Sequence, residues 1–352
     1  MLDLQEESDT SEPEQNEYTP ATDPRADPML SIWNDSSDES AGVFGLPFAL
    51  DEASLAIVPA PWDAACSQGF GTALAPELIL QTSRFLELHD IELGNIYERG
   101  IAMVPTRGEL TQYAQQASIL QSSDEYPARL DSLSRQFSAI VDAEVSRHID
   151  ENRRVGLLGG DHSVSLGAIA AHCRACPEMG ILQIDAHADL RPSLDGLTRS
   201  HASVMYHVME DISPVSLTQV GIRGLCSVER AYLEHNKRIH MISDYSMQQS
   251  LASGETWLAV CDRIIETLPE QVYLTLDIDG LDPAFCPHTG TPVPGGLTYH
   301  QVTILLHRLI DSGRLLLGFD LVEVGGHEQD ALIAAHLLYR LCGLVAPVTA
   351  GG

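Results

Sequence analysis

The chain contains 352 residues, 44% of them hydrophobic, which is enough to bury a substantial core in one large α/β domain or two smaller ones. Its 50 acidic and 20 basic residues give a formal charge of −30, which opposes binding to nucleic acid and to anionic membranes and favours small cationic ligands. No apolar run reaches the roughly 18 residues that a membrane span requires, and the acidic start resembles no targeting signal, so we expect a cytoplasmic protein with no nucleic-acid or membrane partner.

Residues 1–40 are predicted to form a disordered acidic N-terminal tail. They hold twelve of the acidic residues, one arginine and many Ser, Thr and Pro residues, a composition that buries too little apolar surface to offset the entropy of ordering. Residues 41–352 are expected to carry the folded part of the chain. The seven cysteines are scattered and odd in number, which fits a reducing compartment better than a disulfide framework.

From Phe44 onward, short apolar runs alternate with longer amphipathic stretches, which is typical of β-α units around a mostly parallel sheet. Apolar residues at helical spacing predict helices over 130–149 and 328–343. The strands are apolar on both faces, as a sheet covered by helices on both sides requires. They are predicted over residues 55–61, 101–105, 155–160, 180–187, 215–223, 239–243, 272–280 and 315–324.

Four of these strands end in polar or metal-binding residues, and ligands bind beyond the carboxyl ends of strands in an open parallel sheet. Side chains two apart on an extended chain point the same way, so Asp185, His187 and Asp189 can converge. Asp277 and Asp279 can converge likewise. Together with His162 they form a group of four carboxylates and two imidazoles, whose mutual repulsion two divalent cations would relieve. The four motifs are "GGDHS" (159–163), "DAHAD" (185–189), "DIDGLDP" (277–283) and "DLVEV" (320–324).

Such a dinuclear site predicts hydrolysis without a protein nucleophile. Two metal ions about 3.5 to 4 Å apart can share a water, lower its pKa and present hydroxide to an electrophilic carbon or phosphorus. Carboxylate-rich ligation with two histidines favours Mn²⁺, although ligand type leaves Ni²⁺, Co²⁺ and Fe²⁺ open. A phosphoester hydrolase would need basic residues near the site, and Arg191 is the one such residue within the motifs.

The motifs "GGDHS", "DAHAD" and "LDIDGLDPAFCPHTGTPVPGG" resemble, in this order, the signatures of the ureohydrolase (arginase/agmatinase) family, and of its agmatinase-like members in particular. The resemblance covers about residues 55–345. It implies that residues 41–352 form a ureohydrolase catalytic domain, a single α/β domain of the arginase type with an eight-stranded, mostly parallel sheet and helices on both faces.

The same resemblance implies a binuclear manganese site, with Ni²⁺ as the alternative, that hydrolyses a guanidino compound to an amine and urea. A metal-bridging hydroxide would attack the guanidinium carbon. Asp185 and Asp277 would be bridging ligands. The six ligands at matching motif positions are His162, Asp185, His187, Asp189, Asp277 and Asp279.

Two further residues receive catalytic roles beside Asp189. A guanidinium is planar and permanently cationic, so it needs a carboxylate that accepts paired hydrogen bonds, and Glu323 matches the family's guanidinium-binding glutamate. The leaving amine needs a proton, and His201 stands where the family often has a proton-shuttling histidine. Substrate contacts are predicted for both residues and for Asp282 and His288.

Departures from the family pattern bear on the substrate. Many agmatinase-like members have His-Gly-Thr where this chain has His201, Ala202 and Ser203, and the methyl group of Ala202 narrows the approach to the site. Thr275 replaces a common serine and keeps the hydroxyl. His288 occupies a position that is frequently glycine, and His327 follows two glycines where relatives often have other residues.

The predicted partner is a small cationic guanidino substrate of the agmatine type. Guanidinobutyrate, guanidinopropionate, arginine, formiminoglutamate and free guanidine are alternatives within the same chemistry, and the lack of an evident Asn/Ser-rich loop for an α-carboxylate disfavours arginine. A catalytically silent regulatory homologue is the alternative outside that chemistry, although all six ligands are present. By analogy with the family we expect a homo-oligomer, a trimer or a hexamer.

Overall fold

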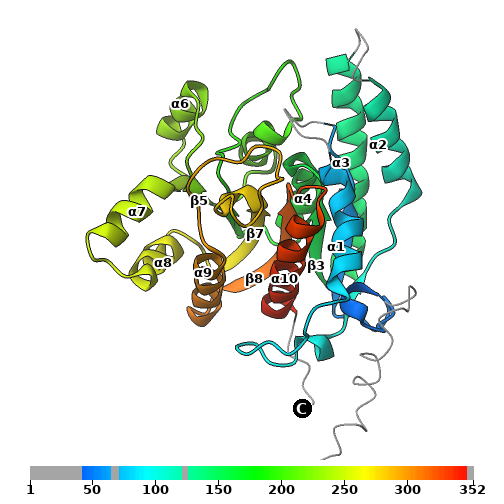
Figure 1. The fold of residues 1–352 in the computed structure, drawn as a ribbon. Coiled ribbons are helices and arrows are strands. Elements are labelled where there is room, and N and C mark those ends of the chain that lie inside the picture. The colour runs from blue at the N-terminus through cyan, green and yellow to red at the C-terminus, as the bar shows by residue number, and fades with distance from the viewer. Residues whose placement is uncertain (1–41, 65–70, 121–125, 347–352) are drawn as a thin grey trace, which may run out of the picture. The chain divides into compact units, whose positions relative to one another are not determined.

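The computed structural model describes residues 42–64, 71–120 and 126–346. The predicted acidic tail therefore lies outside the described residues. Residues Glu39–Gly352 group into one compact unit, which is the α/β domain shown in Figure 1. No helix in the described ranges is both long and apolar enough to span a membrane.

One parallel sheet runs through this unit, with the strand order β2-β1-β3-β8-β7-β4-β5-β6. The predicted eight-stranded α/β fold is confirmed. Because every neighbouring pair is parallel, the carboxyl ends of all the strands lie at one edge of the sheet. The strands are β1 (Leu55–Ala60), β2 (Ile101–Met103), β3 (Arg154–Gly159), β4 (Gly180–Ile184), β5 (Leu217–Ile222), β6 (Ile239–Ser243), β7 (Gln271–Asp277) and β8 (Leu315–Val322).

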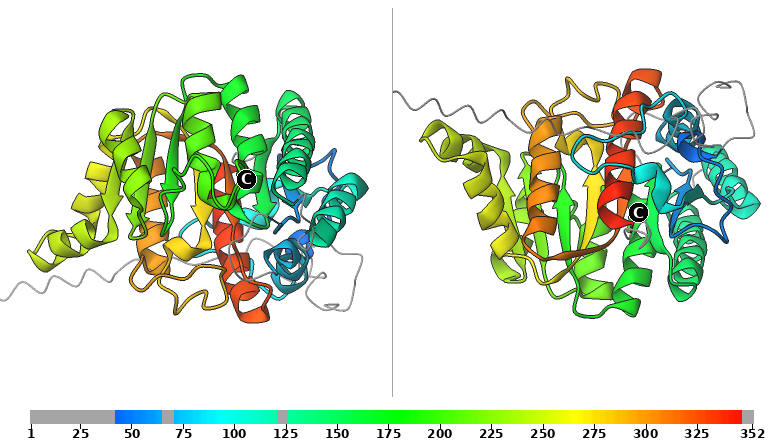
Figure 2. Two further views of the ribbon diagram at one scale, coloured as in Figure 1. Left: turned by 90° about the horizontal axis from the view of Figure 1, so that it is seen from above. Right: turned by 90° about the horizontal axis from the view of Figure 1, so that it is seen from below.

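Helices cover both faces of the sheet, as the two views of Figure 2 show. Helices α1, α9 and α10 pack on one face, and α3 and α4 pack on the other. The two predicted helices are confirmed as α3 and α10. The helices are α1 (Ala75–Ser83), α2 (Gly108–Leu120), α3 (Tyr126–Asp150), α4 (Ser165–Ala175), α5 (Val204–His207), α6 (Ser227–His235), α7 (Asp244–Ala252), α8 (Trp257–Glu266), α9 (Tyr299–Asp311) and α10 (Glu328–Val345).

Sequence features explain how these elements begin and pack. Thr298 and Gln301 form a reciprocal capping box at the start of α9, which satisfies donors that the first turn of a helix leaves free. Helix α3 buries Phe137 against Trp62, with ring centroids 4.9 Å apart. The central strands are buried along almost their whole length, whereas β6, at the sheet edge, is mostly exposed or half-buried.

Several strands end earlier than predicted, which changes the account of how the site forms. Strand β4 ends at Ile184, so Asp185, His187 and Asp189 lie in the following loop. Strand β7 ends at Asp277, and Asp279 belongs to a 3₁₀ turn, Ile278–Gly280. The predicted alternation along an extended chain is therefore wrong as the reason for convergence.

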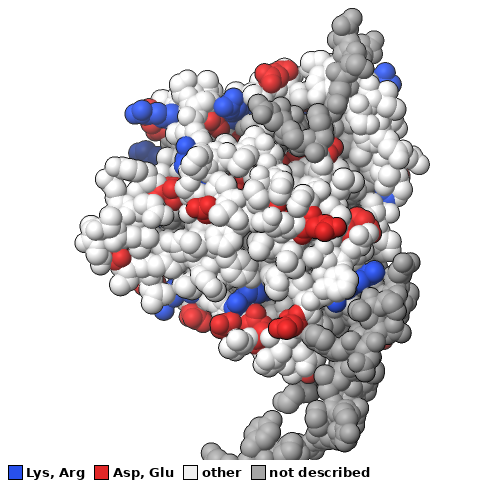
Figure 3. All heavy atoms as spheres, viewed as in Figure 1, with Lys and Arg blue, Asp and Glu red and all other residues white. Residues whose placement is uncertain are grey.

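The charged side chains on the face seen in Figure 3 stand singly or in small groups among uncharged ones. Acidic and basic residues are interspersed there. On this face, the acidic residues of the described part of the chain are thus spread over the surface and not gathered into one patch.

Two glycines allow backbones to meet at the carboxyl edge of the sheet. A Cβ atom at Gly160, just after β3, would lie 1.8 Å from the carbonyl oxygen of Trp62, which follows β1. A Cβ atom at Gly280 would lie 2.7 Å from the backbone nitrogen of Asp185. Both contacts involve backbone, so no side-chain rotation can relieve them. These glycines set the spacing of the loops that carry the candidate site.

Substituting Gly160 tests this packing. We expect Gly160→Ala to lower the free energy of unfolding by about 3 kcal/mol, because the added methyl group overpacks a backbone contact. Gly108→Ala is the matched control, since a Cβ atom there meets nothing within 4 Å and should leave stability within about 1 kcal/mol of the wild type. Denaturant midpoints measure both, and equal midpoints for the two variants would contradict the packing argument.

Candidate metal centre

The predicted metal ligands come together at the carboxyl ends of three of the four central strands. His162 follows β3 in a 3₁₀ turn, His162–Val164. Asp185, His187 and Asp189 follow β4, and β7 leads into Asp277 and Asp279. Strands β3 and β4 are separated in the sheet only by β8 and β7. The structure therefore gathers all six predicted residues, although they span more than a hundred positions.

The side chains fall into two groups that share one carboxylate. One group contains His162, Asp185 and Asp277, and the other contains Asp185, His187 and Asp279, with the ligand atoms of each group within 4.8 Å of one another. Asp189 joins the first group, because its Oδ2 lies 2.9 Å from Nδ1 of His162. Each group could hold one divalent ion, with Asp185 common to both groups.

His162 supplies the clearest sign that a cation fits. Its Nδ1 is buried and forms no hydrogen bond within the described residues. Carboxylate oxygens of Asp185, Asp189 and Asp277 nevertheless lie 3.2, 2.9 and 3.5 Å from it. A nitrogen lone pair that faces several carboxylates is unfavourable unless a cation lies between them. The donor set of imidazole and carboxylate groups fits a divalent transition-metal ion.

Hydrogen bonds on the Nε2 side of the ring fix the tautomer of His162. Its Nε2 lies 2.8 Å from Oγ1 of Thr275, and that hydroxyl donates its own proton to Oδ1 of the buried Asp320 at 2.7 Å. The Thr275 oxygen must therefore accept the Nε2 proton of His162, so that in the neutral, metal-binding form of the ring the lone pair is on Nδ1. Ligating histidines are commonly held by such an outer hydrogen bond.

The carboxylates are held by neighbouring backbone and amide groups. Asp185 accepts hydrogen bonds from Nε2 of Gln183 at 2.7 Å and from the backbone nitrogen of His187 at 2.6 Å. Oδ1 of Asp279 accepts from the backbone nitrogen of Ala186 at 2.9 Å, and Nδ1 of His187 lies 3.0 Å from its Oδ2. The loops after β4 and β7 thus orient each other's ligands.

Burial and mutual repulsion shift the pKa values of these carboxyl groups. Burial, then the charges of Asp189 and Asp279, raise the pKa of Asp185 to about 7. Burial and the charges of Asp279 and Asp185 raise the pKa of Asp277 well above its usual range. A bound cation would favour the ionised forms that burial and repulsion oppose.

Glu323 directly follows β8 and lies beside the ligand cluster. Its side chain is buried, and its Oε1 accepts the backbone N–H of His162 at 2.8 Å. The hydroxyl of Thr289 donates to its carbonyl oxygen at 2.8 Å. Burial and the charge of Asp161 raise the pKa of Glu323 well above its usual range. The carboxylate is thus fixed in place where a cationic ligand could compensate its charge.

Two site residues adopt backbone conformations that L-amino acids rarely use. Asp189 has a φ angle of 54° and Glu323 a φ angle of 60°. Each costs of the order of 1 kcal/mol relative to an ordinary conformation, and such residues concentrate at functional sites.

A cavity of about 340 Å³ opens beside the cluster, lined by His187, Asp189, Arg191 and His201 among others. His201 begins a 3₁₀ turn, His201–Ser203, and is half-buried. Ala202 also lines the cavity. The structure therefore brings His201 to the open side of the predicted metal site.

Asp282 and His288 do not line this cavity in the described part of the chain. Asp282 accepts the backbone N–H of Ala284 at 2.9 Å and stabilises a turn. His288 lies against His327 and Asp330. The contacts with substrate predicted for these two residues stay predictions.

Some residues that shape the site were not singled out from the sequence. Gln183 and Gln219 are buried in β4 and β5, and Nε2 of Gln219 donates to Oε1 of Gln183 at 2.7 Å. Arg223, just after β5, donates from Nη2 to the carbonyl oxygens of Asp279 and Leu281 at 2.6 and 3.1 Å. The sequence did contain a signal for each of them. Gln183 and Gln219 are polar residues within otherwise apolar strands, and Arg223 is a basic residue at the carboxyl end of a strand.

Comparison with known proteins agrees with this geometry. A model of the arginase family matches residues 53–343. The chain belongs to the arginase family. Among arginase-family relatives, N(1)-aminopropylagmatine ureohydrolase of Thermus thermophilus is 32% identical over 84% of this chain and 91% of its own. Human mitochondrial Arginase-2 is 30% identical, over 55% of this chain and 60% of its own.

Solved structures of the arginase family share the fold. The agmatine ureohydrolase of Thermoplasma volcanium superposes with a TM-score of 0.69, at 24% identity, over 86% of this chain and 94% of that one. An arginase from Medicago truncatula gives 0.67 at 23% identity, over 83% of this chain and 87% of that one. The curated relatives are ureohydrolases, which supports amidinohydrolase activity for this member of the family.

The hydrogen bonds behind His162 lead to a testable prediction. Thr275→Val removes the hydroxyl that accepts the Nε2 proton but keeps the side-chain shape, so metal affinity should fall about 10- to 100-fold. Thr275→Ser keeps the hydroxyl and should retain affinity near that of the wild type. Metal titration of the purified variants measures the difference. Equal affinities for the valine and serine variants would show that the bond does not orient the ligand.

Proposed function

We propose that this arginase-family protein hydrolyses a guanidino compound to an amine and urea at a binuclear metal centre, using two Mn²⁺ ions, with Ni²⁺ as the alternative. The observation that carries the proposal is the buried, unbonded Nδ1 of His162 facing the carboxylates of Asp185, Asp189 and Asp277, in the described part of the chain. The six proposed ligands are His162, Asp185, His187, Asp189, Asp277 and Asp279.

The chain's own residues divide the remaining tasks. Two bound divalent ions would supply an activated water at neutral pH. Glu323 would hold the guanidinium, because a fixed carboxylate can accept parallel N–H bonds from that planar cation. The backbone N–H of His162 keeps one Glu323 oxygen in place, so the substrate carbon is held in a defined position. His201, on the cavity side, would carry the proton to the leaving amine.

An agmatine-type substrate with a cationic tail is the primary candidate. Curated relatives at 30–32% identity carry the name N(1)-aminopropylagmatine ureohydrolase. Glu229 lines the cavity and is buried, so an acidic group lies near the path of a substrate tail. The formal charge of −30 also favours the approach of cations.

A carboxylate-tailed substrate, such as guanidinobutyrate or guanidinopropionate, is the second candidate. Arg191 lines the same cavity with 40% of its side chain exposed, and its nearest acidic partner, Glu229, lies 3.8 Å away. That distance exceeds a hydrogen bond. The guanidinium of Arg191 could therefore donate hydrogen bonds to the carboxylate of a bound substrate.

Location and assembly form part of the proposal. We place the reaction in the cytoplasm, and the six cysteines within the described residues, all unpaired, support that placement because reducing compartments keep thiols free. A homo-oligomer, trimer or hexamer, is proposed on the resemblance to the family alone. Residues 41–352 would form the catalytic domain, with the segment 1–40 as a disordered tail.

A substrate panel tests the reaction. Purified protein with Mn²⁺, and separately with Ni²⁺, should release urea from agmatine faster than from arginine, guanidinobutyrate, guanidinopropionate or guanidine. Formiminoglutamate, whose hydrolysis would give formamide, is assayed for that product and should react more slowly than agmatine. Asp277→Ala should abolish urea release and lower the number of bound ions, since it removes a ligand of the centre. Asp51→Ala, at an exposed carboxylate outside the site, is the control. If no compound yields urea or formamide, the silent regulatory homologue replaces the proposed hydrolase.

Glu323→Gln separates substrate binding from metal binding. The amide keeps the shape of the side chain but loses the charge, so kcat/KM should fall about 100-fold. Both metal ions should remain, because Glu323 is not among the proposed ligands. Elemental analysis and a urea assay on the same sample give the two readings. Loss of an ion together with activity would make Glu323 a ligand and contradict the assignment.

The variant Arg191→Gln distinguishes between the two candidate substrates, one with a cationic tail and one with a carboxylate tail. Removing this charge should raise the ratio of kcat/KM for agmatine to that for guanidinobutyrate roughly fivefold, as expected for an exposed charge pair. Arg230→Gln is the control, since Arg230 is exposed on α6 and pairs with Glu234. An unchanged ratio would mean that neither tail reaches Arg191.

A further inference from the structure

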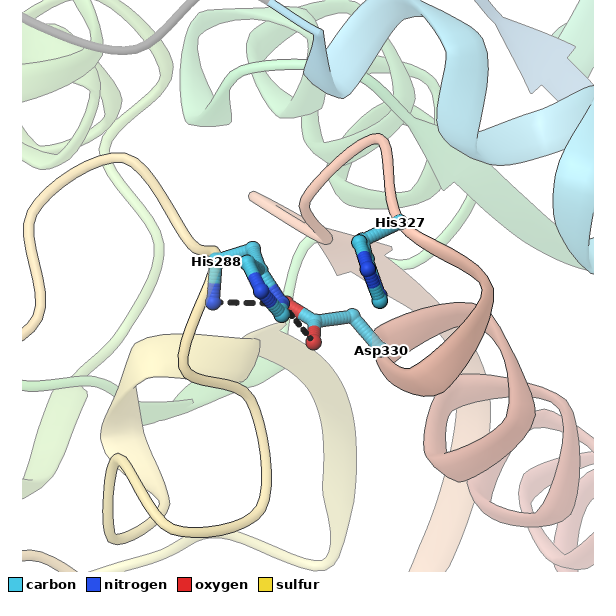
Figure 4. A group of neighbouring side chains, drawn as sticks. All are labelled: His288, His327 and Asp330. Atoms are coloured by element: carbon cyan, nitrogen blue, oxygen red, sulfur yellow. Dashed lines mark hydrogen bonds and ion pairs between the residues drawn. The ribbon is translucent and has the colours of Figure 1, made fainter.

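A second group of metal-binding side chains lies outside the centre described above. It consists of His288, His327 and Asp330, which Figure 4 shows together. His288 belongs to the loop between β7 and α9, whereas His327 caps the start of α10 and Asp330 lies in its first turn. The two imidazole rings stack, with centroids 3.9 Å apart and planes inclined by 16°. Two segments distant in sequence thus bring these three side chains together.

Asp330 is the fixed point of this cluster. Its carboxylate is fully buried, and Oδ2 accepts the backbone N–H of His288 at 3.0 Å. Oδ1 lies 2.9 Å from Nδ1 of His288. Gly325 leaves room for this contact, because a Cβ atom there would lie 2.3 Å from the carbonyl oxygen of His288 and 2.9 Å from Oδ2 of Asp330. The buried carboxylate of Asp330 can therefore reach the exposed His288 because Gly325, which lies beside this contact, has no side chain.

The hydrogen bonds leave a nitrogen lone pair on each ring. An ionised Asp330 holds a proton on Nδ1 of His288, so the lone pair of that ring is on Nε2. Nδ1 of His327 accepts the backbone N–H of Gln329 at 3.2 Å, so this nitrogen carries the lone pair of its ring. That bond is near the long end of the usual range, and a metal ion could replace it.

The distances are compatible with one ion. A nitrogen of each ring and an oxygen of Asp330 lie within 4.8 Å of one another. A tetrahedral ion with ligands at about 2.0 to 2.1 Å brings such atoms to about 3.4 Å. Both histidines are exposed, so their rings can turn out of the stack and direct a nitrogen of each ring at one ion. Turning the His288 ring releases Oδ1 of Asp330 from Nδ1, and this oxygen can then bind the ion while the buried Asp330 stays fixed. Two nitrogens and one oxygen are also the ligands of a common type of zinc site.

We propose that His288, His327 and Asp330 form a third metal site, for one Zn²⁺-like divalent transition-metal ion, distinct from the binuclear centre. Its exposure leaves the remaining coordination positions to water, so the ion exchanges with solvent. The ion links the β7–α9 loop to α10. That loop also contacts the proposed active site, because Thr289 bonds the carbonyl of Glu323 and Thr291 approaches Asp279.

Metal stoichiometry tests the proposal independently of activity. The purified full chain, saturated with Zn²⁺ and dialysed at fixed free Zn²⁺, should hold three ions by elemental analysis. His288→Ala/His327→Ala should hold one fewer. His235→Ala/His240→Ala, which removes two exposed histidines elsewhere, should hold as many as the wild type. Equal numbers in the wild type and the His288/His327 variant would overturn the proposal.

The same comparison in the Asp277→Ala background separates this site from the centre. There the His288/His327 substitution should again remove one ion, whatever the centre retains. His288→Gln/His327→Gln guards against a folding defect, since glutamine keeps polarity and bulk, and it should also lose the ion. A third ion retained by the glutamine variant, or anomalous scattering from zinc crystals without a peak beside the ring nitrogens of His288 and His327, would equally refute the site.

Discussion

Repulsion among buried carboxylates is the constraint on which the rest of this structure depends. Asp185, Asp189, Asp277 and Asp279 all lie at one edge of the sheet with almost no access to water, and the lone pair of His162 points among them. The repulsion must be offset by bound protons or by cations, and divalent cations would do so while every carboxylate stays ionised. The neighbouring features serve this arrangement. Glycines let the loops approach, and backbone N–H groups hold each oxygen.

Much of the fold was predictable because it rests on local patterns. Continuous apolar runs marked the strands, and helical spacing marked α3 and α10. The six proposed ligands could be named because motifs of the family place them at fixed positions, and the structure brings these residues together. Their convergence was not explained correctly, because β4 ends at Ile184 and the ligands lie in a loop. The positive φ angles of Asp189 and Glu323 depend on tertiary contacts, which no local pattern encodes.

Residues that position the proposed ligands through hydrogen bonds were harder to predict from the sequence than the proposed ligands themselves. Thr275 was noted only as a replacement for serine, yet it decides which nitrogen of His162 carries the proton. Gln219 and Arg223 act through hydrogen bonds that join segments far apart in sequence. His288 was singled out as a possible substrate contact, whereas the structure gives it Asp330 as its partner. Sequence motifs identify the side chains that could bind a metal ion, but only the folded structure shows which groups form hydrogen bonds with them.

The order of the strands has a consequence for biosynthesis. Strands β7 and β8 are inserted between β3 and β4, so the last strands to leave the ribosome fill a gap between earlier ones. Until they arrive, His162 and the residues after β4 belong to two incomplete half-sheets and cannot share an ion. Long-range pairing of this kind is slow to form. Ions could therefore bind at the proposed centre only after nearly the whole polypeptide has left the ribosome, and they would not stabilise a shorter nascent chain.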